Sequence, residues 1–148
     1  MDDRVAKLKT PEDCEKFAKN AERLDRPDLV EDAIRRAVEL RAKDYGSASD
    51  AEKECLQAVY AYEEVVSKKN GKRTRASRTW QMIERHGILQ AAERAVNRPV
   101  ETVAYRALIE MELRDFAFEA VISRHPDAFS QEAVEVAWQR LRELKGDA

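Results

Sequence analysis

The four prolines and four glycines of this 148-residue chain stand at the edges of apolar stripes with helical spacing, and this placement constrains the fold most strongly. Proline is favoured at the first position of a helix, because its missing N–H would have no partner there, and glycine is favoured just past the last turn. Pro11 and Pro27 each open a stripe, and Gly46 and Gly71 each follow one. Since strand-like alternation is absent, the sequence predicts an all-α protein.

Side chains that can cap helices mark where the predicted helices begin. A Ser or Thr before a helix can accept a hydrogen bond from a free backbone N–H three residues on, so Thr10, Ser49 and Ser130 are predicted N-caps. Asp115 is predicted to cap a short helix over 116–122. We expect one compact domain of about seven to eight helices, with an acidic three-helix segment at 1–67, a basic loop and helix pair at 68–98, and further helices over 99–148.

The large apolar side chains are predicted to form the core. Among the aromatic residues this applies to Phe17, Tyr62, Phe116, Phe118 and Trp138. The face of the last helix is predicted to be Val134, Ala137, Trp138, Leu141 and Leu144. Trp80 has two interpretations, because it borders a basic stretch: it could stack on a nucleic-acid base or anchor its own helix, and the second is favoured.

Charge is segregated along the chain although the formal net charge is only −2. Residues 1–67 hold 12 basic and 17 acidic side chains, and residues 99–148 hold 6 and 10. Residues 68–98 hold nine basic side chains against Glu84 and Glu93, a net charge of +7. The nine are Lys68, Lys69, Lys72, Arg73, Arg75, Arg78, Arg85, Arg94 and Arg98. Such local asymmetry indicates an anionic partner.

The basic segment 68–98 carries the chemistry that binds phosphate backbones. Lys meets a phosphate as a point charge and Arg as a two-pronged donor. The residues predicted to bind nucleic acid are Lys68, Lys69, Lys72, Arg73, Arg75, Arg78, Gln90, Arg94 and Asn97. Lys72, Arg73, Arg75 and Arg78 would hold phosphates, while Gln90, Arg94 and Asn97 could reach base edges. The sequence therefore predicts a non-catalytic nucleic-acid-binding protein, with DNA ahead of RNA.

The residues around Gly87 have the outline of a helix-turn-helix. A short helix is predicted to end near His86. A second, amphipathic helix is predicted after Gly87, with Ile88, Ala91 and Val96 on its apolar face. Glu93 stands where a helix-turn-helix usually has a buried aliphatic residue. An alternative interpretation is a helical adaptor that binds an acidic protein through the basic segment 68–98 or through the N-terminal helical hairpin. The basic segment could also dock on the acidic helices of its own chain.

Catalytic and metal-binding patterns are not predicted. His86 and His125 each stand at a helix end, where they are expected to interact with C-terminal carbonyls, and no spacing pairs them with other ligands. Acidic pairs such as Glu63 and Glu64 are expected to be solvated helix faces. We therefore expect no catalytic residues, no metal and no cofactor.

The expected compartment is the cytoplasm. The first ten residues lack an apolar core of the kind found in secretion signals, and no apolar run approaches the ~20 residues that span a bilayer. Cys14 and Cys55 have no partner at metal-site or redox-motif spacing, so both are predicted to be small buried residues. The sequence predicts no membrane partner and makes no prediction of oligomeric state.

Overall fold

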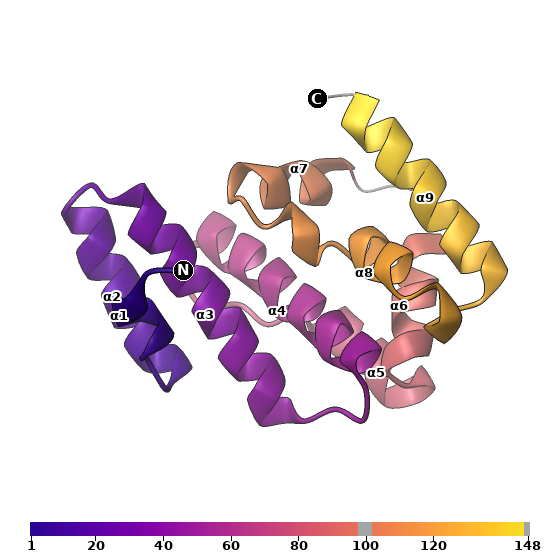
Figure 1. Ribbon diagram of the computed structural model, residues 1–148, viewed down its shortest axis with the longest axis horizontal. Helices are drawn as coiled ribbons and strands as arrows, with labels where there is room; N and C mark the ends of the chain where they lie inside the picture. Colours follow the sequence, from indigo (N-terminus) through magenta and orange to yellow (C-terminus); the bar gives the residue numbers. More distant parts are fainter. Residues whose placement is uncertain (98–101, 147–148) are drawn as a thin grey trace. The chain divides into compact units, whose positions relative to one another are not determined.

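The computed structural model describes residues 1–97 and 102–146, and the described residues are helical with no strand (Figure 1). The all-α fold class is thus confirmed. Pro99 and Arg98, which belong to sequence predictions, lie outside the described residues, as do the side chains of Val103 and Leu144. The chain divides into two compact units, Met1–Ser47 and Ala48–Ala148.

The first unit is a helical hairpin with one extra turn of helix. It consists of α1 (Asp3–Ala6), α2 (Pro11–Arg23) and α3 (Pro27–Tyr45), and α3 packs against both others. Thr10 caps α2 as predicted, since its Oγ1 accepts from the N–H of Asp13 at 3.1 Å. Cys14 lies in a small core with Ala37 and Leu40. The single turn α1 was not predicted from the sequence.

The second unit contains the remaining helices. They are α4 (Asp50–Asn70), α5 (Ser77–His86), α6 (Ile88–Asn97), α7 (Thr102–Glu110), α8 (Phe118–Arg124) and α9 (Gln131–Gly146), with 3₁₀ turns η1 (Arg114–Phe116) and η2 (Pro126–Ala128). The core joins α4, α6, α8 and α9 and consists of Cys55, Ala58, Ala92, Val96, Val121, Ile122, Phe129, Ala133 and Ala137. Most of these side chains are small, so the helices approach one another closely.

Two of the predicted capping residues in this unit behave as expected and one does not. Ser49 accepts from the N–H of Glu52 at 3.2 Å, and Ser130 accepts from the N–H of Ala133 at 3.2 Å. The helix predicted over 116–122 with Asp115 as its cap is wrong. Ala117 is extended, with ψ of 146°, so α8 begins only at Phe118 and Asp115 belongs to η1.

The predicted apolar face of α9 is also partly wrong. Ala133 and Ala137 are fully buried, Arg140 is 8% exposed, and Trp138 is 49% exposed. The buried positions follow i, i+4 and i+7, and Trp138 points at least about 100° away from each of them on the helix. The guanidinium of Arg140 lies 3.4 Å from the carboxylate of Glu119 on α8, and this pairing accounts for a buried charge at a core position.

Candidate nucleic-acid interface

Helices α5 and α6 line an open groove of about 810 Å³ in the second unit. Both walls carry guanidinium groups and side-chain amides. Arg78, Gln81 and Arg85 come from α5, and Gln90, Arg94 and Asn97 come from α6. The groove therefore gathers side chains that are up to about two helical turns apart on each helix.

The apolar residues of the two helices explain why these polar side chains meet. Trp80 and Ile83 of α5 are buried, and so are Ala92 and Val96 of α6, the latter two in the core of the second unit. Since a helix that buries one face presents the opposite face outward, the Arg, Gln and Asn residues remain at the surface. Gly87, with φ of 86°, joins the helices in the left-handed region that favours glycine, and its N–H donates to the carbonyl of Ile83 at 2.8 Å.

Three arginines of the groove are not neutralised within the described part of the chain. Arg78, Arg85 and Arg94 are exposed, and none of them forms an ion pair or hydrogen bond with a described residue. The carboxylate that lines the groove, that of Glu93, has a partner: its Oε1 accepts from the backbone N–H of Ser130 at 2.7 Å, at the start of α9. The groove is thus positively charged.

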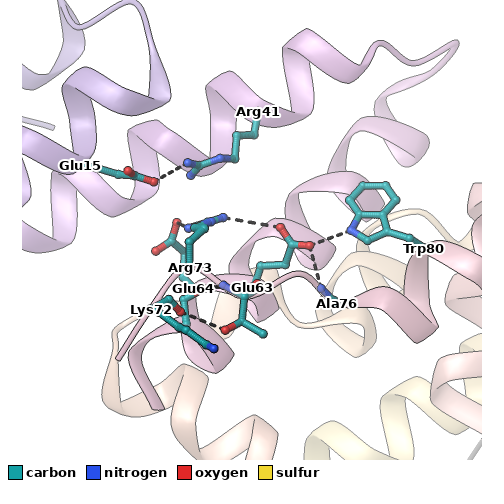
Figure 2. A network of polar contacts seen from close by, with 10 residues as sticks. Glu15, Arg41, Glu63, Glu64, Lys72, Arg73, Ala76 and Trp80 are labelled. Carbon is teal, nitrogen blue, oxygen red and sulfur yellow. Dashed lines mark hydrogen bonds and ion pairs between the residues drawn. The ribbon is translucent and has the colours of Figure 1, made fainter. Parts of the chain in front are cut away.

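The loop between α4 and α5 holds its cations differently. Glu63 of α4 is 5% exposed, and its Oε2 accepts from the N–H of Ala76 at 2.9 Å and from the indole Nε1 of Trp80 at 2.7 Å (Figure 2). The guanidinium of Arg73 lies 3.5 Å from Glu63 and donates to Glu64 at 2.8 Å. These contacts fix the loop to α4 and neutralise Arg73.

The expectation that Glu63 and Glu64 form a solvated face is therefore wrong, since Glu63 is buried and the side chain of Glu64, paired with Arg73, is only 14% exposed. Adjacent helical positions point about 100° apart, so one member of an acidic pair can be buried while the other remains nearer to the surface. Burial of Glu63 is tolerated because three donors surround its carboxylate. The sequence offered no signal for this pairing, because the donors belong to a different segment of the chain.

Trp80 anchors its helix, as the favoured interpretation predicted. It is 5% exposed and packs near Tyr60 of α4, with ring centroids 5.2 Å apart. The guanidinium carbon of Arg75 lies 5.1 Å from the centroid of the Trp80 rings, a cation–π contact. Arg75 is thereby held against the protein, and Trp80 does not present a face for base stacking.

The lysines predicted to bind nucleic acid lie beside the loop rather than in the groove. Lys68 and Lys69 are exposed in the last turn of α4, and Lys72 is exposed after Gly71. Thr74 holds the loop that carries Lys72. Its N–H donates to Ser67 Oγ at 2.8 Å, and its hydroxyl donates to the carbonyl of Lys72 at 3.0 Å. These three lysines are not among the residues that line the groove.

The structure thus brings together Arg78, Gln90, Arg94 and Asn97 among the predicted residues, and it separates them from Lys68, Lys69, Lys72, Arg73 and Arg75. It adds Arg85 and Gln81, which the sequence analysis did not select. A signal for them existed, because Gln81 and Arg85 follow Arg78 at i+3 and i+7 and so share its helix face.

The α5–α6 pair differs in one respect from the helix-turn-helix of DNA-binding proteins. The turn in such motifs has about three to four residues, whereas here Gly87 alone separates the two helices. Glu93 at the predicted buried position is half-buried and is explained by its hydrogen bond to Ser130. A base-reading role for α6 remains a prediction.

A second polar cluster lies at the other end of α4. The carboxylate of Glu54 accepts from Arg124 Nε at 2.7 Å and contacts Nε2 of His125, which follows α8. Burial by itself would raise the pKa of Glu54, but the hydrogen bonds from His125 and Arg124 outweigh it and lower the pKa. In the described part of the chain no group of three His, Cys, Asp or Glu side chains is placed to hold a metal ion.

Both cysteines are buried, as predicted, and both are free thiols. Burial raises the pKa of Cys55 to about 12, so its thiol is unreactive in the folded protein. Among the described residues, none of the helices is both long enough and apolar enough to cross a membrane.

Comparison with known proteins found no match: no family model, no curated protein and no solved structure matches this chain. The geometry and charge of the α5–α6 groove are therefore the basis for a functional assignment.

Proposed function

We propose that this chain is a non-catalytic nucleic-acid-binding protein that uses the α5–α6 groove and takes DNA ahead of RNA. The observation that carries the proposal is the convergence of Arg78, Arg85 and Arg94 on one groove without a carboxylate partner among the described residues. Guanidinium groups bind phosphate oxygens through two parallel hydrogen bonds, and a cluster of them is the usual footprint of a polyanion site.

The preference for DNA is supported by what lines the groove. Sequence-specific RNA recognition targets unpaired bases that stack on aromatic side chains. The described lining holds His86 but no Phe, Tyr or Trp, and Trp80 is buried. A helical duplex, which presents phosphates rather than open bases, suits this lining better than a single strand.

A salt titration tests the proposal. Binding of the full chain to a random DNA duplex is measured by fluorescence anisotropy between about 50 and 200 mM salt. We expect Arg78→Ala with Arg94→Ala to weaken binding at low salt by about 30-fold and to reduce the log–log salt slope by about 2, one for each lost phosphate contact.

The matched control is Lys53→Ala with Arg142→Ala, which removes the same charge from exposed positions outside the groove. We expect this control to weaken binding less than three-fold, because it alters only the long-range field. Equal losses in the two double variants, or no binding of any duplex at low salt, would contradict the proposed function.

An acidic protein is the alternative partner for the same cations. Poly-glutamate separates the two, because it carries carboxylates in place of phosphates. We expect a DNA duplex to displace poly-glutamate from the chain at a much lower concentration of charge than the reverse, since phosphate offers Arg a better bidentate acceptor array. Preferential binding of poly-glutamate would favour the adaptor interpretation.

A further inference from the structure

The shape of the α5–α6 groove limits how a duplex can bind there. A recognition helix reads base edges by entering the major groove of DNA, which is about 12 Å wide, so it must form a ridge on the protein. Here Gln90, Arg94 and Asn97 of α6 line a hollow opposite Arg78 and Arg85 of α5. A hollow on the protein can accommodate a ridge of its ligand, and the ridges of a DNA duplex are its two sugar–phosphate backbones.

The length of the hollow suits a short run of one strand. Arg78 and Arg85 are separated by seven residues on α5, and so are Gln90 and Asn97 on α6, which corresponds to about 10 Å along each helix. One strand of duplex DNA rises about 3.4 Å per nucleotide. Each polar row therefore has the length of about three nucleotides.

The donors in the hollow fit phosphate oxygens. Three guanidinium groups and three side-chain amides line it, and each can donate to a backbone oxygen without regard to the base attached. Glu93 is the carboxylate among the lining residues. Its Oε1 accepts from the N–H of Ser130, which ties this carboxylate to the start of α9.

We propose that the α5–α6 groove seats one sugar–phosphate strand of a DNA duplex and binds it independently of base sequence. This inference rests on the proposed function and replaces base reading by Gln90, Arg94 and Asn97 with phosphate contact. Glu93 then opposes binding, because its charge lies beside the seated phosphates and is held in place by the start of α9.

Glu93→Gln distinguishes the two modes of binding by the sign of its effect. The glutamine carbonyl can still accept from the N–H of Ser130, so the start of α9 keeps its partner while the negative charge is lost. A phosphate seat predicts binding about three-fold tighter on every duplex, since a like charge is removed. A carboxylate that accepts from cytosine predicts weaker binding, and only on duplexes that contain that base pair.

The experiment measures the affinity of the full chain for a set of labelled duplexes of equal length, including A·T-only, G·C-only and mixed sequences. The variants are Glu93→Gln and Gln90→Ala with Asn97→Ala, and the melting temperature of each checks the fold. We expect wild-type affinities within about three-fold across the set, tighter binding of all duplexes by Glu93→Gln, and an equal loss on all of them in the amide variant.

The possible failures have different meanings. If one duplex binds more than a hundred-fold tighter than the others and the amide variant loses this preference, the amides read bases. That result overturns the inference, although the proposed function stands. Tighter binding of the unpaired strand than of its duplex would also overturn the inference alone. No binding of any nucleic acid at low salt would remove the proposed function and the inference with it.

Discussion

The arginines at the two ends of the basic segment 68–98 are held in opposite ways. In the loop before α5, Arg73 is paired with Glu63 and Glu64, and Arg75 lies on Trp80. In the α5–α6 groove, Arg78, Arg85 and Arg94 have no such partners in the described structure. The loop has the denser run of charge in the sequence, yet the groove is the better candidate site. Charge density along a chain thus does not locate a binding surface, because neighbouring helices decide which cations are neutralised.

The strongest test of this contrast is Glu63→Ala. This change leaves the N–H groups of Ala76 and Trp80 without an acceptor and opens a void beside Arg73, so we expect the free energy of unfolding to fall by about 3 kcal/mol. Urea denaturation measures it. Glu63→Gln is the matched variant, since its carbonyl can occupy the position of Oε2 and accept from both donors. A Glu63→Ala protein as stable as the wild type would mean that Glu63 does not hold the loop.

Arg85→Ala tests the other side of the comparison. Arg85 lines the groove and is unpaired in the described structure, so its loss should leave the free energy of unfolding within about 0.5 kcal/mol of wild type. DNA binding at low salt should weaken by about ten-fold and the salt slope should fall by about 1, as measured by anisotropy. A loss of stability without a loss of binding would place Arg85 with the structural arginines.

Arg73→Ala should show the reverse pattern. The ion pairs with Glu64 and Glu63 are lost from a side chain that is 38% exposed, so solvent screening limits the expected loss of stability to about 1 kcal/mol. DNA affinity should change by less than about two-fold, because this guanidinium is already occupied within the chain. Should Arg73→Ala weaken binding as much as Arg85→Ala does, the division between loop and groove would be mistaken.

The smallest expected effect concerns Glu54, which binds Arg124 and His125 much as Glu63 binds the loop. Its pKa in the folded protein is lower than the ordinary value of 4.5, so the carboxylate contributes stability above that value and loses it as the pH falls through the lowered pKa. We expect the difference in unfolding free energy between wild type and Glu54→Gln to shrink from about pH 5 towards about pH 3. A difference that grows on acidification would contradict the lowered pKa.

Part of the candidate site could be read from the sequence. Gln90, Arg94 and Asn97 were predicted from the amphipathic helix after Gly87, and Arg78 was predicted from the basic run over 68–78. Arg85 follows from helical periodicity as well, since it stands at i+7 from Arg78, although it lies outside the densest run of charge. The pairing of Arg73 with Glu63 and Glu64 was not available, since it depends on how the loop folds back along α4.

The helices and several of their ends follow from local residue preferences, because Thr10, Ser49 and Ser130 cap backbone N–H groups only three residues away. Packing between helices makes Glu63 buried and Trp138 exposed, and it leaves the arginines of the groove at the surface and unpaired within the described residues. A helix end depends on residues that are neighbours in the sequence. The neutralisation of a charge depends instead on which distant side chains the packing of the core brings within a few ångströms of it.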